Sequence, residues 1–264
     1  MDSTIEPHFF GKSDRQLLGI YHRPDGRARR HGVVICPPAP QEYMRTHLAM
    51  RRLAAILSRD GFHVLRFDYY GTGDSAGGSS DGSLEEWQAN IVSAIADLKD
   101  CSGVTKVSLV GLRLGAALAA RAAVAIANFV LWDPVIKGSA YLEELRAIHQ
   151  RRFADLLFPI PVAGIGEGGD LLGFPLSIAM EAEIRSVDVI EQMACRAEHI
   201  VLVSSTDQEP DAMLGATFAR SQAGTAPFER HVVAERSVSD GEDGMLLSTQ
   251  ALQVIASALS RRLA

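Results

Sequence analysis

The chain has 264 residues, of which 47% are hydrophobic and 22% charged, and it carries a formal net charge of −6. This length supports one sizeable core, and an α/β chain of this length usually forms one unit with an insertion rather than two domains. The acidic balance argues against a nucleic-acid surface, because phosphate binding needs clustered cations. We interpret the arginines within 27–30 and 151–152 as solvated charges on loop or helix faces.

The cysteine content and the hydropathy of the chain indicate the cellular compartment in which we expect the protein. The three cysteines, Cys36, Cys101 and Cys195, are widely spaced and odd in number, which is typical of reduced thiols in a cytosolic protein. The N-terminus shows no basic region followed by an apolar stretch, so no signal peptide is expected. The most apolar stretch, 116–132, is broken by Arg121 and is interpreted as a buried helix running into a strand. We therefore expect a cytoplasmic protein without a membrane span.

Residues 1–134 predict an alternation of strands and helices. The opening segments 5–10 and 16–22 alternate apolar and polar side chains around a turn, as an antiparallel pair does. From residue 32 onward, strand and helix patterns follow one another, which predicts a parallel sheet with right-handed crossovers. The further strands are expected at 32–36, 63–67, 106–110 and 128–132, and the helices at 43–59, from about Ser83 with Glu86 at capping-box spacing, and at 115–127.

The pattern changes after residue 134. A Gly- and Pro-rich stretch, 159–175, separates two segments that read as helices, 138–158 and 176–189. Strand and helix patterns then return at 199–204, 211–222, 229–233 and 244–263. The sequence therefore predicts an α/β fold with a core formed by 1–134 and 190–264, and with 135–189 inserted as a lid over the C-terminal edge of the sheet.

Three separated motifs carry a resemblance to a known family. They are the Pro37-Pro38 turn, the loop 67–75 (Phe-Asp-Tyr-Tyr-Gly-Thr-Gly-Asp-Ser), and Gly111-Leu-Arg-Leu-Gly115 before an Ala-rich helix. In this order they resemble the α/β-hydrolases, in which a Gly-X-Ser-X-Gly elbow lifts a nucleophile above the sheet. The elbow also resembles that of a bacterial subgroup of hydrolase-like proteins found beside exosortase or natural-product assembly genes. The resemblance implies a mostly parallel central sheet flanked by helices.

The same resemblance implies that the catalytic triad is missing. Arg113 occupies the nucleophile position, and a guanidinium stays protonated and cannot attack a carbonyl. The acid position falls on Asp207, or on Asp133 if the acid follows the preceding strand. The loop expected to hold the histidine, 234–245, contains none, and His231 lies a few residues early on a predicted strand. Serine-type hydrolysis is therefore not expected, because serine needs histidine as its base.

Arg113 has two interpretations. It lies at a predicted helix N-terminus, where the amides of Leu114 and Gly115 and the helix dipole favour an anion, so it is a candidate anion or oxyanion stabiliser. The alternative is a structural plug that forms a salt bridge with Asp207 or Asp133 in place of the lost histidine.

The loop after the strand 32–36 is a candidate oxyanion loop. Pro40 lacks an amide hydrogen, which leaves Ala39 and Gln41 as candidate donors. Glu42, Tyr43, Arg45 and His47 begin the following helix and are candidates to face the same pocket, with His47 as a general base. A lone histidine on a helix is, however, more often a surface or packing residue.

No metal-ligand spacing and no nucleotide-binding fingerprint is present in the sequence, so no cofactor is expected. One hypothesis is a non-hydrolytic enzyme of bacterial specialised metabolism that acts on a carbonyl- or carboxylate-bearing intermediate by isomerisation, cyclisation, elimination or acyl transfer. A second is a pseudohydrolase that binds an acyl or peptidyl intermediate, free or carrier-bound, or a partner protein. A third is an esterase or thioesterase using carboxylate-activated water. The oligomeric state stays open, a homodimer included.

Overall fold

The computed structural model describes residues 5–154, 167–206, 214–216, 227–234 and 249–261. An eight-stranded sheet runs through its centre in the order β1-β2-β4-β3-β5-β6-β9-β10. The strands are β1 (Ile5–Lys12), β2 (Arg15–His22), β3 (His31–Cys36), β4 (His63–Phe67), β5 (Lys106–Leu112), β6 (Ala125–Trp132), β9 (Arg196–Ser204) and β10 (Phe228–Val232).

The sheet is mostly parallel. Strands β4, β3, β5, β6, β9 and β10 pair in parallel, whereas β1 and β2 form an antiparallel pair that joins β4 antiparallel. The predicted opening pair and the predicted α/β fold class are therefore confirmed. The nearly continuous buried runs of β3 and β5 suit such a sheet, because both of its faces are covered by helices.

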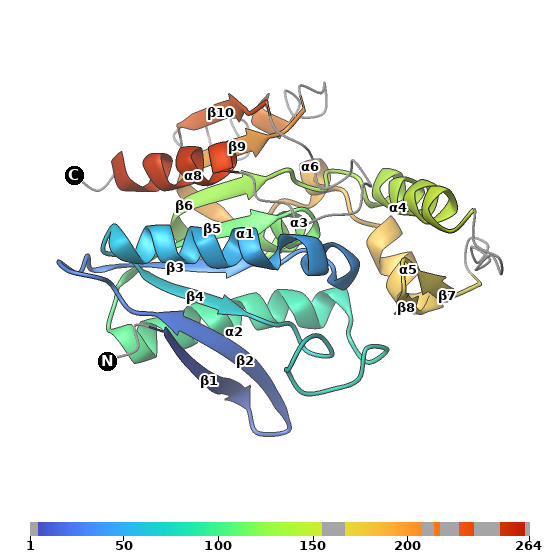
Figure 1. Ribbon diagram of the computed structural model, residues 1–264, viewed down its shortest axis with the longest axis horizontal. Coiled ribbons are helices and arrows are strands. Elements are labelled where there is room, and N and C mark those ends of the chain that lie inside the picture. The colour runs from blue at the N-terminus through green and yellow to red at the C-terminus, as the bar shows by residue number, and fades with distance from the viewer. Residues whose placement is uncertain (1–4, 155–166, 207–213, 217–226, 235–248, 262–264) are drawn as a thin grey trace.

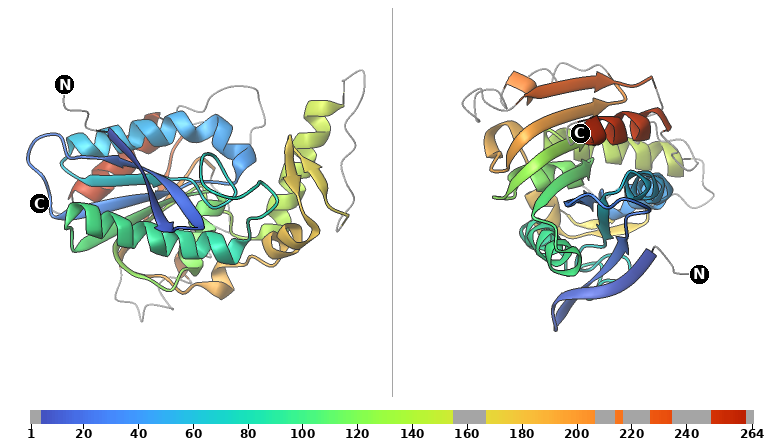
Figure 2. Two further views of the ribbon diagram at one scale, coloured as in Figure 1. Left: turned by 90° about the horizontal axis from the view of Figure 1, so that it is seen from below. Right: turned by 90° about the vertical axis from the view of Figure 1, so that its left-hand side faces the viewer.

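Helices cover both faces of the sheet (Figures 1 and 2). Helices α1 and α8 pack with one set of strand side chains, including Val33, Val110 and Val130, and α2 and α3 pack with the other set. The helices are α1 (Pro40–Arg59), α2 (Leu84–Ser102), α3 (Leu114–Arg121) and α8 (Thr249–Arg261). None of the described helices has the length and apolarity needed to cross a bilayer.

Two local expectations differ from the structure. The helix expected at 115–127 ends at Arg121, and Ala125 already belongs to β6. The run from Ala122 to Ala127 contains no Gly, Pro or polar residue to mark the change, so its periodicity does not separate helix from strand. Helix α1 begins at Pro40 rather than near residue 43, because proline suits the first helical position, where its missing amide costs nothing.

The segment between β6 and β9 forms a layer of its own. It contains α4 (Gly138–Phe153), the hairpin of β7 (Gly169–Leu171) and β8 (Phe174–Leu176), α5 (Ile178–Arg185) and α6 (Val189–Gln192). The helix predicted at 176–189 is confirmed over α5, at 178–185, whereas Leu176 ends β8 and Val189 begins the separate short helix α6. Figure 1 shows α4, α5 and the hairpin beyond the ends at which the parallel strands finish.

Two glycines allow the turn from β5 into α3. A Cβ on Gly115 would lie 2.2 Å from the carbonyl oxygen of Pro37, and one on Gly111 would lie 2.4 Å from the Cα of Ala116. Both neighbours are backbone atoms, which cannot move away by a change of rotamer. The spacing of glycines in the elbow motif is therefore a steric requirement for packing α3 against the end of β3.

Gly115→Ala should lower the free energy of unfolding by about 3 kcal/mol or more, because overpacking against backbone forces the chain to shift. Gly103→Ala is the matched control: its φ is +70°, but nothing lies within 4 Å of the added Cβ. The control substitution should lower the free energy of unfolding by only about 1 kcal/mol. Urea unfolding of both variants measures the difference, and equal losses would contradict the steric explanation.

Candidate functional site

The turn that links β5 to α3 holds Arg113 in a conformation that L-residues rarely adopt. Its φ is +52° and its ψ is −118°, and a non-glycine residue with positive φ is strained by about 1–3 kcal/mol. Backbone hydrogen bonds fix the turn: the amide of Arg113 donates to Trp132 O at 3.0 Å, and Arg113 O accepts from Val135 N at 3.2 Å. The strained corner is thus retained although its side chain is not a nucleophile.

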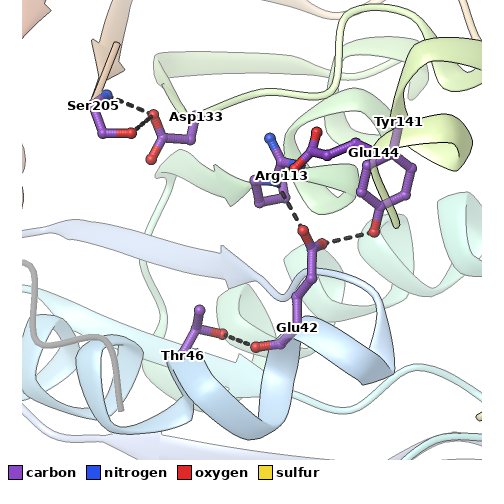
Figure 3. Close-up of polar contacts among 7 residues, drawn as sticks. All are labelled: Glu42, Thr46, Arg113, Asp133, Tyr141, Glu144 and Ser205. Carbon is purple, nitrogen blue, oxygen red and sulfur yellow. Dashed lines mark hydrogen bonds and ion pairs between the residues drawn. The ribbon is translucent and has the colours of Figure 1, made fainter. Parts of the chain in front are cut away.

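The guanidinium of Arg113 lies between two carboxylates (Figure 3). Nε donates to Glu42 Oε1 at 2.9 Å, and Nη2 donates to Glu144 Oε1 at 2.7 Å. The hydroxyl of Tyr141 donates to the second oxygen of Glu42 at 2.7 Å, and the ring of Tyr141 lies 5.3 Å from Arg113 Cζ. These four residues, which we call the Arg113 cluster, join α1, the elbow and α4.

Burial makes the electrostatics of the Arg113 cluster strong. Arg113 and Glu42 are 7% and 5% exposed, whereas the side chain of Glu144 is 31% exposed. Burial opposes the charge of Arg113, but the carboxylates of Glu42 and Glu144 outweigh it and raise the pKa of the guanidinium. Burial also raises the pKa of Glu42, while Arg113 and Tyr141 act in the opposite sense. The charged pair persists because each group neutralises the other.

The register of α1 explains why Glu42, and not His47, reaches Arg113. Glu42 and Thr46 belong to the buried side of α1, and Thr46 Oγ1 donates to the carbonyl of Glu42 at 3.0 Å. His47 lies five positions after Glu42, which places it about 140° around the helix. It is exposed there, and its Nδ1 lies 3.0 Å from Met44 O. Tyr43 is half-buried, and burial together with the carboxylate of Asp68 raises its pKa to about 12.

The structure does not show the expected salt bridge between Arg113 and Asp133. The partners of Arg113 are Glu42 and Glu144, not Asp133. Asp133 has a φ of +42° at the end of β6, and its Oδ1 accepts from Ser205 N at 2.6 Å and from Ser205 Oγ at 2.9 Å. This turn directs the carboxylate to the end of β9, where it holds the neighbouring strand (Figure 3). Asp207 lies outside the described residues.

A cavity of about 260 Å³ adjoins the start of α1. Its wall includes Ala39 and Gln41, the two predicted donors, so the structure brings the oxyanion-loop candidates to a cavity. Leu114 is fully buried, and neither it nor Arg113 is among the described residues that line this space. The other walls are the glycine-rich loop 71–82, the β7–β8 hairpin and α5.

The chemistry of the cavity is mainly apolar. Trp87, Leu171, Phe174 and Ile184 supply large hydrophobic surfaces. The N-terminus of α1 supplies polarity, because its first turn has no side-chain cap and the amide of Gln41 is a first-turn donor. Such a cavity suits a small apolar body with a carbonyl oxygen.

Other reactive groups are held in structural roles. Cys36 is buried at the end of β3, and burial raises the pKa of its thiol. No disulfide joins Cys36, Cys101 and Cys195, all of which lie in the described part of the chain. His231 lies on β10, where burial lowers its pKa. Among the described residues, no group of three or more His, Cys, Asp and Glu side chains is arranged to hold a metal ion.

Sequence reasoning missed Glu144 and Tyr141. Both lie on α4, and Tyr141 is 99 residues from the carboxylate that it binds. Their spacing of three residues places them on one side of a helix. That spacing was a usable signal, because a buried arginine in the elbow requires carboxylates, and the inserted helix could supply them.

The geometry agrees with comparisons to known proteins. Residues 31–235 match the model of the alpha/beta hydrolase family. The chain belongs to this family. A search of the curated proteins found no match.

Solved structures resemble this member of the family along nearly its whole length. A putative hydrolase from Agrobacterium vitis S4 is 20% identical with a TM-score of 0.58, and the match covers 99% of this chain and 100% of that one. Est1E from Butyrivibrio proteoclasticus, with ferulic acid bound, is 15% identical with a TM-score of 0.65 and 97% coverage of both chains. The esterase Pf2001 from Pyrococcus furiosus is 15% identical with a TM-score of 0.62, covering 98% and 91%. At these identities the likeness shows the fold.

Arg113→Met should lower the free energy of unfolding at pH 7 by about 3–5 kcal/mol, because it leaves the buried carboxylate of Glu42 without its cation. The loss should depend on pH. Burial already raises the pKa of Glu42 above 4.5, and the substitution removes a group that lowers it. A raised carboxyl pKa costs nothing below the unfolded pKa, and the cost grows as pH rises through the folded-state pKa. The variant should therefore approach the parent near pH 4.5 and fall behind at higher pH.

The double variant Arg113→Met/Glu42→Gln is the control for this pH dependence. It removes the titrating carboxyl, so most of the pH-dependent difference from the parent should disappear. Chemical unfolding across pH measures all three proteins. A single variant whose loss is the same at every pH would contradict the role given to Glu42.

Proposed function

We propose that this protein binds a small acyl or aromatic molecule with a carbonyl group in the 260 Å³ cavity, and that it does so without serine-type hydrolysis. The observation that carries the proposal is the double ion pair of Arg113 with Glu42 and Glu144. It fills the nucleophile position with a satisfied, buried structural group. Of the hypotheses raised by the sequence, the pseudohydrolase is therefore favoured.

The charge of the Arg113 cluster argues against a direct anion site. One guanidinium faces two carboxylates, and one of them is almost fully buried. Arg113 therefore offers little uncompensated positive charge to a ligand carboxylate. A neutral carbonyl oxygen at the uncapped start of α1 avoids this repulsion, because a helix N-terminus also favours partial negative charge.

The dimensions and lining of the cavity define the ligand class. Ligand pockets commonly enclose about 300–1,000 Å³, so a space of about 260 Å³ fits a short acyl chain or a single ring. Ala39 and Gln41 provide the polar end near α1, while Trp87 and Phe174 provide the apolar walls. A solved structure of the same fold carries ferulic acid, whose aromatic ring supports a ligand with a single ring.

In this proposal, the insertion 135–189 acts as a lid and Arg113 as its anchor. Glu144 on α4 binds the guanidinium, and the backbone amide of Val135 binds the carbonyl of Arg113. At a second contact between the insertion and the core, Glu183 of α5 accepts a hydrogen bond from the amide of Leu84, the first residue of α2, at 2.5 Å. The resemblance of the elbow to proteins of bacterial specialised metabolism supports a free or carrier-bound acyl intermediate as the ligand, in the cytoplasm.

A second function, non-hydrolytic catalysis on such a ligand, is favoured by one observation. Burial raises the pKa of Glu42, whose backbone follows directly on the cavity-lining Gln41. Buried carboxyl groups with raised pKa values often serve in proton transfer. Single-turnover assays with the ligand would show a Glu42-dependent product if this function holds and would return unchanged ligand if it does not.

Filling the cavity should abolish ligand binding. Met180→Trp adds a large side chain on α5, at a position that lines the cavity. Ile178→Trp adds the same side chain on the same helix, where Ile178 is 56% exposed. Ligand-observed NMR with methyl butyrate, methyl hexanoate, ferulic acid and methyl ferulate should detect binding to the parent and to Ile178→Trp, but not to Met180→Trp. Binding that survives in Met180→Trp would place the ligand elsewhere.

Neither the parent nor Arg113→Ser should hydrolyse 4-nitrophenyl butyrate above the buffer rate. The elbow has no nucleophile, and a serine placed there would have no histidine base, because 232–248 contains no histidine. Release of 4-nitrophenol is followed by absorbance. Parent activity that disappears in Asp207→Asn would contradict this expectation and support hydrolysis by carboxylate-activated water.

A further inference from the structure

A second concave site lies at the opposite end of the sheet from the Arg113 cluster. Its volume is about 770 Å³, and it is bordered by His31 and Lys106, the first residues of β3 and β5. The elbow follows the last residue of β5, so the length of the sheet separates the two places. In Figure 1 this end of the strands faces away from α4 and α5.

The lining of this cavity is strongly cationic in a chain whose net charge is −6. Five cationic side chains line it, together with one carboxylate, that of Asp60. The Oδ2 of Asp60 accepts a hydrogen bond from Ser260 at 2.9 Å. The five, which we call the basic cavity residues, are Arg27, Arg29, Arg30, Arg59 and Lys106.

Most of this positive charge is uncompensated. Within the part of the chain that the structure describes, no carboxylate forms an ion pair with Arg27, Arg30 or Arg59. Lys106 pairs with Glu198 at 3.3 Å, but both side chains are more than half exposed, so this pair is weak. Arg59 is in the last turn of α1, where one cation complements the helix dipole. That effect accounts for one of the five cations.

The arginine-rich segment is fixed to the core rather than extended into solvent. The amide of Asp25 donates to Ser58 O and that of Arg29 to Gly61 O, both at 2.8 Å. Gly61 has a φ of +91°, and a Cβ there would lie 2.5 Å from Arg27 O, so the close approach depends on glycine. The segment therefore presents its side chains on a rigid support.

Two contacts also orient the guanidinium group of Arg29. Arg29 Nε donates to the carbonyl of Asp60 at 2.7 Å, and its Cζ lies 5.0 Å from the centre of the Phe62 ring. A cation held over an aromatic ring keeps its charge while losing conformational freedom. Preorganisation of this kind reduces the entropic cost of binding a ligand.

We propose that the basic cavity residues form a binding site for a multivalent phosphate anion, such as the di- or triphosphate group of a small molecule. Guanidinium groups bind phosphate oxygens through paired hydrogen bonds, and several of them on a concave surface reinforce one another. Arg27 and Arg30 are exposed, as expected for solvated charges, so they are accessible to such an anion.

Isothermal titration calorimetry with sodium tripolyphosphate tests the proposal on the full chain. The parent should bind, and its Kd should increase as NaCl is added, because the contacts are ionic. Arg27→Gln/Arg30→Gln/Arg59→Gln should weaken binding by about ten-fold or more. The control Lys12→Gln/Arg52→Gln/Arg151→Gln removes the same charge from exposed positions outside the cavity and should change Kd by less than about two-fold.

Protection from phenylglyoxal gives a readout that needs no variant. Tripolyphosphate should slow the modification of Arg27, Arg30 and Arg59, as mapped by mass spectrometry, while Arg52 and Arg151 react at an unchanged rate. Absence of tripolyphosphate binding, equal weakening in both triple variants, or equal protection of all arginines would overturn the proposal. Tighter binding of deca-glutamate than of tripolyphosphate would also overturn it, since the surface would then fit an acidic protein.

Discussion

The ion pairs of Arg113 hold together three parts of the molecule that the chain supplies separately: the first turn of α1, the elbow after β5, and the inserted helix α4. An arginine in the strained corner of this fold is a buried charge, and such a charge is stable only when it is paired and hydrogen-bonded. Glu42 and Glu144 meet that requirement, and Tyr141 satisfies the second oxygen of Glu42. The contact between α4 and the elbow follows from this constraint, and so does the small amount of uncompensated positive charge at Arg113.

The fold was predictable where local signals are strong. The strand 63–67 was placed at its observed bounds, and Ser83 caps α2 by accepting from the amide of Glu86, as the capping-box spacing indicated. Between α3 and β6 the sequence is uniformly small and apolar, so the point at which helix becomes strand depends on packing in the sheet. The start of α1 could have been predicted from the sequence, because Pro40 is a typical first helical residue.

Only the elbow of the candidate site could be predicted from the sequence; the residues that contact Arg113 could not. The glycine spacing identified the elbow and Arg113 as its apex, and the steric contacts of Gly111 and Gly115 explain why that spacing is specific. The partners of Arg113 were not identified, because Glu42 is 71 residues away and Glu144 is 31 residues away. Pairing across such separations is decided by topology, which a single sequence does not specify. The basic cavity was missed for the same reason, since Arg59 and Lys106 join the segment 27–30 only in the folded chain.

The strained conformation of Arg113 has an evolutionary consequence. Replacing the arginine by serine would return the side chain of a hydrolase to a backbone that still has the required shape, yet it would strand two carboxylates, one of them buried. A serine-based site at this position would therefore require at least four coordinated substitutions: a serine at 113, a histidine within reach of it, and neutral residues in place of Glu42 and Glu144. Replacing Arg113 first would leave the buried carboxylate of Glu42 without its cation and so lower stability. The backbone of the elbow thus keeps a shape that would suit a nucleophile, while the charges packed around it would have to change together before a neutral side chain could take that place.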